Sequence, residues 1–211
     1  YVAGCPLIVY DPERVPFEIT GYEDLWNESL TDSVACLEQY RVLIGVTLKT
    51  LGYSMNETDP DILAKAREKL MPLYKNIRTA AMQSGEASVG FLFTPFASLL
   101  MQEFPQYKLV YPKEGLGFGI DGFVLTAASQ NVESAHAFLN YLMDAKVAAH
   151  DAEYQAYMCV NKAAEAELSA DYWANPAYNP PEEMLKNAEY VKNIGDAESL
   201  YADIYAAFKL Q

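Results

Sequence analysis

Residues 111–126 read YPKEGLGFGIDGFVLT, and this stretch organises the rest of the chain. Its four glycines precede an apolar run, and the segment from Phe123 to Thr126 has the aromatic and β-branched content of a buried strand. Glycines let the backbone take positive φ and let another group approach closely. We therefore expect an open backbone that leads into a buried strand at 123–126.

One carboxylate, that of Asp121, lies inside the glycine segment, where little side-chain bulk would shield it. An acid on an open backbone beside a strand suits a pocket wall that faces a cationic group. The alternative is a turn aspartate that caps its own loop. The pattern alone leaves both roles open.

Residues 117–122 also match the G-x-G-x-x-G template of dinucleotide-binding proteins. That motif requires a strand before the glycines and a helix that opens from them. Here Lys113 and Glu114 precede the glycines, and the predicted strand follows them. This context argues against a dinucleotide, and we expect no cofactor.

The composition is that of a folded protein with a sizeable core, because 51% of the 211 residues are hydrophobic and 21% are charged. The net charge of −14 argues against a nucleic-acid or anionic-membrane partner, since surfaces that bind phosphate are basic. It is compatible with a cationic ligand. The 16 tyrosines would offer flat apolar faces and hydroxyls to such a ligand.

The cysteine count and the length of the apolar runs restrict the class of protein further. Three cysteines are too few and too scattered for a disulfide framework or a zinc site, and Cys5 with Cys36 is the candidate pair if their strands adjoin. No run approaches the roughly 18 apolar residues of a membrane span. Because Tyr1 already begins an apparent strand, we expect the chain to be a piece of a longer protein.

Short apolar runs alternate with helical patterns along the first two thirds of the chain, which predicts an α/β fold with a mostly parallel sheet. The last helix, expected over 197–208, has an apolar stripe that would dock on the body. The other elements expected on this basis are strands at 33–37, 89–93 and 108–111, and helices at 39–51, 60–70, 95–102, 131–143 and about 146–157.

No set of residues forms a catalytic site. His136 and His150 are the only histidines, and both fall on predicted helices without a nearby nucleophile. We therefore expect no enzymatic activity.

The chain resembles the bacterial spermidine/putrescine-binding proteins, which are extracytoplasmic solute-binding subunits of ABC importers. The resemblance runs in order through essentially all 211 residues. Its motifs are Asp24-Leu25-Trp26, LGYSMNETDP at 51–60, KLMP at 69–72 and YPKEG at 111–115.

The resemblance implies a periplasmic-binding-protein-like (type II) fold, a clamp of two α/β lobes joined by crossing strands. Residues 1–118 and 160–211 would form the carboxy-terminal lobe, and residues 119–159 would belong to the amino-terminal lobe, most of which lies outside this chain. The implied partner is an ABC permease. Whether the parent is a lipoprotein or a permease fusion stays open. Without its partner lobe, the 119–145 region would self-associate or rearrange onto its own lobe.

The resemblance also implies site residues. Asp121 and Tyr157 match a cleft aspartate and tyrosine, and Phe93 stands where the family has a tryptophan that stacks on methylenes. Gln39 stands where the family has an aspartate, and Gly119 stands in place of a second tryptophan. Val42 and Val191 replace a glutamate and a glutamine. The solute could be a polyamine, another amine or a neutral molecule, and the alternative function is a sensory or docking module.

Overall fold

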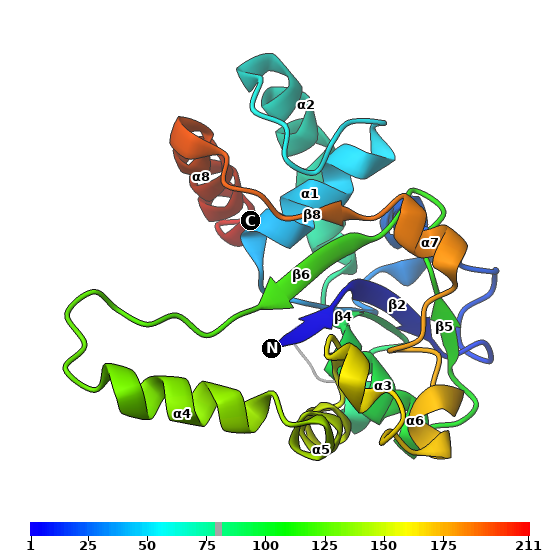
Figure 1. Ribbon diagram of the computed structural model, residues 1–211. Helices are drawn as coiled ribbons and strands as arrows, with labels where there is room; N and C mark the ends of the chain where they lie inside the picture. The colour runs from blue at the N-terminus through cyan, green and yellow to red at the C-terminus, as the bar shows by residue number, and fades with distance from the viewer. Residues whose placement is uncertain (79–81) are drawn as a thin grey trace.

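Two four-stranded sheets form the frame of the molecule, and a computed structural model describes it at residues 1–78 and 82–211 (Figure 1). The first sheet has the strand order β7-β1-β6-β8 and the second the order β3-β4-β2-β5. Their bounds are β1 (Val2–Gly4), β2 (Pro6–Tyr10), β3 (Val34–Cys36), β4 (Val89–Phe93), β5 (Lys108–Val110), β6 (Gly117–Asp121), β7 (Met158–Cys159) and β8 (Glu189–Tyr190).

The sheets are mixed, so the prediction of a mostly parallel sheet is wrong. Strand β2 runs antiparallel to both β4 and β5, and β1 runs antiparallel to both β6 and β7. Parallel pairing joins β3 to β4 and β6 to β8. Strand–helix alternation did not reveal that β2 enters the second sheet directly from β1, in the opposite direction to β4.

Helices cover both faces of the second sheet. Alternate residues of β2 pack into two cores: Ile8 and Tyr10 face one, and Leu7 and Val9 face the other. Helices α1, α2 and α8 cover the first face, whereas α3, α5 and α6 cover the second (Figure 1). The helices are α1 (Tyr40–Thr50), α2 (Pro60–Leu70), α3 (Thr94–Glu103), α4 (Val132–Leu142), α5 (Ala145–Gln155), α6 (Ala170–Ala174), α7 (Glu182–Lys186) and α8 (Glu198–Lys209).

Local sequence signals account for the ends of several helices. The Asp59 carboxylate accepts hydrogen bonds from the backbone N–H groups of Asp61 and Ile62 at the start of α2. Gly52, which follows α1, has a φ of 80°, a conformation that favours glycine. Helix α8 buries Tyr201, Ile204 and Phe208 in the first core. The α/β class therefore follows from the sequence even though the strand directions do not.

The strand within residues 111–126 lies earlier in the sequence than predicted. Gly117 and Gly119 lie within β6, whereas residues 123–126 are exposed and form no strand. The ladder between β1 and β6 ends at the pair Val2–Asp121, so the backbone beyond Asp121 has no partner strand in the described residues. Residues 117–121 themselves form a strand, so the order of strand, glycine turn and helix that a dinucleotide-binding motif requires does not occur at this segment.

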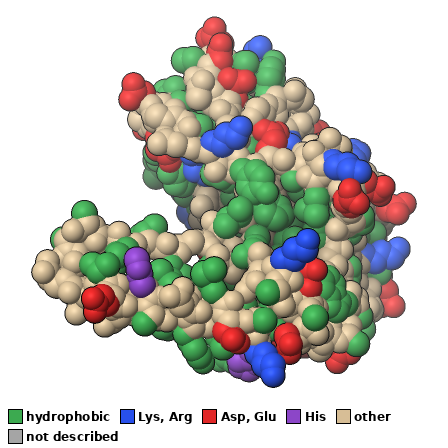
Figure 2. All heavy atoms as spheres, viewed as in Figure 1, with side chains coloured by type: hydrophobic (Ala, Val, Ile, Leu, Met, Phe, Trp, Pro, Cys, Tyr) green, Lys and Arg blue, Asp and Glu red, His purple; other side chains and the backbone are tan. Residues whose placement is uncertain are grey.

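The segment that follows β6 projects from the body (Figure 1). Helix α4 has no buried residue, and Figure 2 shows hydrophobic side chains on the surface of this projection. Its exposed apolar residues include Phe123, Val124, Phe138 and Tyr141. By contrast, α5 packs on the second core through Ala149 and Ala152.

All three cysteines are free, so the candidate pair of Cys5 and Cys36 does not form. Cys5 immediately precedes β2, Cys36 ends β3, and β4 lies between these two strands. Within residues 1–78 and 82–211, no helix has the length and apolar character that crossing a membrane requires.

Candidate functional site

The crossing strands β1 and β6 bring two of the expected site residues to the edge of the body. Gly119 pairs with Gly4, and Asp121 pairs with Val2. A Cβ atom placed on Gly4 would lie 3.3 Å from both Tyr157 Cε1 and Thr94 Oγ1, so glycine at this position lets the Tyr157 ring lie against the strand. Gly119 is open: the nearest atom to a Cβ there would be the Gly4 carbonyl oxygen, at 3.8 Å.

The charge of Asp121 acts on the hydroxyl of Tyr157. Burial raises the pKa of the Tyr157 hydroxyl, and the negative charge of Asp121 raises it further. The Asp121 carboxylate is exposed and has no ion pair or hydrogen bond with another described residue. It therefore caps no loop in the described structure, and the arrangement is that of a free acid beside a tyrosine on an open strand.

Hydrogen bonds to Cys5 fix the start of α3, and with it Phe93. The Thr94 hydroxyl accepts from the Cys5 N–H at 3.0 Å, and the Thr94 N–H donates to the Cys5 carbonyl at 3.1 Å. Thr94 is fully buried, so these bonds are shielded from water. They hold the half-buried Phe93, the last residue of β4, where the second sheet meets the crossing strands.

Phe93 and Gln39 line one hollow of 610 Å³. Strands β3 and β4 are parallel, so their carboxyl ends lie at the same edge, where open α/β sheets bind their ligands. The Leu37 N–H donates to the Phe91 carbonyl at 3.0 Å, which keeps the two chains side by side up to this edge. Gln39 then precedes α1, and its exposed side chain makes no capping hydrogen bond.

The two valines differ in their placement. Val42 is buried in the first core, where an acid would be costly. Val191 is exposed and follows β8; its N–H donates to the Phe118 carbonyl at 3.3 Å, which places it beside Gly119.

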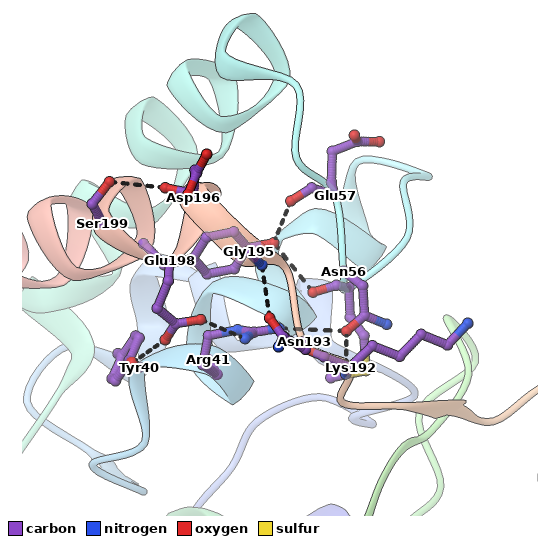
Figure 3. A network of polar contacts seen from close by, with 12 residues as sticks. Tyr40, Arg41, Asn56, Glu57, Lys192, Asn193, Gly195, Asp196, Glu198 and Ser199 are labelled. Carbon is purple, nitrogen blue, oxygen red and sulfur yellow. Dashed lines mark hydrogen bonds and ion pairs between the residues drawn. The ribbon is translucent and has the colours of Figure 1, made fainter.

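A polar network that the sequence analysis missed fixes the start of α1 (Figure 3). The buried Arg41 donates to Glu198 Oε2 at 2.9 Å and to the Lys192 carbonyl at 3.0 Å, and its guanidinium lies 4.9 Å from the centre of the Tyr201 ring. Tyr40 donates to the same Glu198 carboxylate. The network joins the helix that Gln39 precedes to α8 and to the segment after β8. An arginine within an apolar helix carries no local signal of these distant partners.

A second ion pair ties β8 to the other end of α1. Lys49 Nζ lies 2.7 Å from Glu189 Oε1, and the Ser54 hydroxyl and Met55 N–H donate to Oε2 at 2.5 and 3.2 Å. Burial raises the pKa of Glu189, but the hydrogen bonds from Lys49 and Ser54 and the charge of Lys49 outweigh it and lower the pKa overall. Because β8 pairs with β6, this carboxylate links α1 to the strand that carries Asp121.

The described residues contain no group of three or more histidine, cysteine or acidic side chains that would hold a metal ion. The arrangement instead offers a free carboxylate, a tyrosine, an aromatic ring and an amide around the junction of the two sheets. Such groups hold a small organic solute through ionic, aromatic and hydrogen-bond contacts.

Comparison with known proteins identifies the family of the chain. Residues 1–187 match the model of the bacterial extracellular solute-binding proteins, and the chain belongs to this family. It is 30% identical over 219 residues to the spermidine/putrescine-binding periplasmic protein of Escherichia coli, a match that covers 99% of this chain and 62% of that protein. It is 28% identical to spermidine/putrescine-binding periplasmic protein 1 of Haemophilus influenzae, covering 98% of this chain and 59% of that protein.

The fold is also found in solved structures. A putative spermidine/putrescine ABC transporter protein from Listeria monocytogenes superposes with a TM-score of 0.92 and 27% identity, covering all of this chain and 68% of that one. These comparisons confirm the predicted family and the periplasmic-binding-protein-like (type II) α/β fold. The chain spans about three fifths of the length of the curated relatives it matches.

Proposed function

We propose that the protein is the solute-binding component of a bacterial ABC importer, located outside the cytoplasmic membrane, and that its solute is a polyamine or a related small amine. Family membership supports the binding role, and the two curated relatives are spermidine/putrescine-binding proteins by name. The observation that carries the proposal is the free carboxylate of Asp121 beside Tyr157 on the crossing strands.

Each expected site residue has a role in this proposal. Asp121 pairs with an ammonium group, and the Tyr157 ring packs beside it. Phe93 packs on the methylene chain, and Gln39 and Gly119 form the adjoining wall. The protein binds and releases its solute without chemical change.

The solute would be held between two lobes. Residues 1–118 and 160–211 form one lobe in this proposal, and residues 119–159 contribute to the other. The exposed apolar side chains on α4 support this division, because they offer a packing surface to a further part of the protein. In this proposal the two parts join where α5 packs on the second core.

Transport follows from closure of the two lobes on the solute. A solute that contacts both lobes stabilises the closed form, and the permease would recognise that form. The strands β1 and β6 form the crossing point, so Asp121 lies where closure would bring the lobes together.

A second candidate is a sensory or docking module descended from such a binding protein. Gln39 and Val42 favour it, because both stand where the resemblance implies acids. In that case closure would signal to a partner, or the protein would no longer bind an amine.

Isothermal titration calorimetry tests the proposal. The complete protein, with any portion beyond residues 1–211, is titrated with spermidine, with putrescine and with glucose as a neutral control. We expect saturable binding of at least one amine and none of glucose. Binding of glucose alone would contradict the amine assignment, and no binding of any solute would favour the docking module.

A further inference from the structure

We propose that the end of the solute beside Gln39 is uncharged, so that the preferred solute is a linear amine with one ammonium group and one amide end. This inference rests on the proposed function, because it takes Asp121, Phe93 and Gln39 to line one solute site. It concerns which amine the site selects.

The charges around the hollow are already paired. Its charged lining residues are Glu38, Arg78 and Lys209. Lys209 Nζ lies 2.7 Å from Glu38 Oε1, and Arg78 Nη1 lies 2.5 Å from Asp32 Oδ2. The lining residues thus include one carboxylate, which is neutralised by a lysine. A second ammonium group placed here would find two cationic side chains and no free acid among the described residues that line the hollow, which is unfavourable in a partly desolvated site.

Gln39 offers the complementary group. Its side-chain amide is exposed and has no hydrogen-bond partner among the residues that the structure describes. An amide both donates and accepts, so it can bond the carbonyl and the N–H of another amide. Phe93 and Leu37 line the same hollow and suit a methylene chain.

The ammonium end belongs at Asp121, which is the unpaired acid of the crossing strands. Phe93 pairs with Pro6, and Asp121 pairs with Val2. Val2 lies four residues before Pro6 in the sequence. At about 3.3 Å per residue, roughly 13 Å of backbone separates the two positions. In this proposal a linear solute spans the distance between Asp121 and Gln39, with its ammonium group at Asp121 and its amide end at Gln39.

The test compares N-acetylputrescine with putrescine by calorimetry on the complete protein. We expect the unsubstituted protein to bind N-acetylputrescine at least ten-fold more tightly than putrescine. Gln39→Asp places an acid at this wall of the hollow and should reduce or reverse the preference for N-acetylputrescine. An aspartate also suits the position before a helix, so this variant should fold. Gln106→Asp, at an exposed turn, is the control with the same change of charge and should keep the original preference.

The other outcomes separate this inference from the proposed function. Tighter binding of putrescine by the unsubstituted protein would overturn the uncharged end and leave the amine-binding proposal intact. If Gln39→Asp leaves the preference for N-acetylputrescine unchanged, the uncharged end of the solute does not lie beside Gln39. If neither solute binds and spermidine also fails to bind, the proposed function fails, and this inference fails with it.

Discussion

The ion pair between Lys49 and Glu189 makes a sharp prediction, because it ties α1 to the strand next to the proposed site. Glu189→Gln removes the charge but keeps the size of the side chain. The Lys49 side chain is 5% exposed and that of Glu189 30% exposed, so the substitution leaves a nearly buried ammonium without its partner. Breaking a fully buried pair costs about 3–5 kcal/mol. Because Glu189 is partly hydrated and glutamine retains some hydrogen bonds, we expect a loss of about 2 kcal/mol in the free energy of unfolding.

The loss should depend on pH. The folded-state pKa of Glu189 lies below its ordinary value of 4.5, so its contribution to stability is fully present above that pH. The contribution is lost as the pH falls through the lower folded-state pKa. The difference between Glu189→Gln and the unsubstituted protein should therefore be largest near pH 7 and shrink below pH 4.5.

Urea denaturation of the complete protein at several pH values measures this difference. Glu182→Gln is the matched control, since its pair with Lys186 joins side chains that are 86% and 69% exposed. We expect that control to change stability by less than about 0.5 kcal/mol. Equal stabilities of Glu189→Gln and Glu182→Gln at pH 7 would refute the reasoning.

Three further predictions concern the open wall, the last helix and the projecting segment. Gly119→Trp should tighten amine binding by about 1 kcal/mol in calorimetry, because a ring there would have open space and a methylene chain to pack on. Unchanged affinity would show that Gly119 does not line the proposed solute site. Tyr201→Phe should lower the free energy of unfolding by about 1 kcal/mol, because its hydroxyl donates to the Glu57 carbonyl at 2.8 Å, and an unchanged urea midpoint would contradict this. Residues 1–211 alone should self-associate through the exposed Phe123, Val124 and Phe138, and light scattering that shows a monomer would refute this.

The local elements were predictable because their signals are local. Asp59 and Pro60 mark the start of α2, and Gly52 marks the end of α1, whatever the rest of the chain does. The apolar run at 89–93 is the strand β4. Strand direction was not predictable in the same way, because β2 and β4 meet across about 80 residues of chain, and their antiparallel register depends on the route between them.

The strand within residues 111–126 was also not predictable from local signals alone. The composition of 123–126 favours a strand, but a strand needs a partner, and the ladder of β6 ends at Asp121. The strand forms at Gly117–Asp121 instead, because β1 pairs with this segment. Sequence reasoning named Asp121 and Tyr157, which the structure places near each other, and Phe93 and Gln39, which line one hollow. It missed Thr94 and Arg41, whose partners lie far away in the sequence.

We propose that this chain holds an amine through Asp121, and one substitution tests this role most directly. Calorimetry of the complete protein should show that Asp121→Asn weakens binding of the preferred amine by about 2 kcal/mol or more, as expected when a desolvated charge pair loses one partner. Asp171→Asn, at an exposed residue of α6, should leave the affinity unchanged. Phe93→Ala should weaken binding by about 1 kcal/mol through lost packing on the methylene chain. Equal affinities of Asp121→Asn and the unsubstituted protein would contradict the claim.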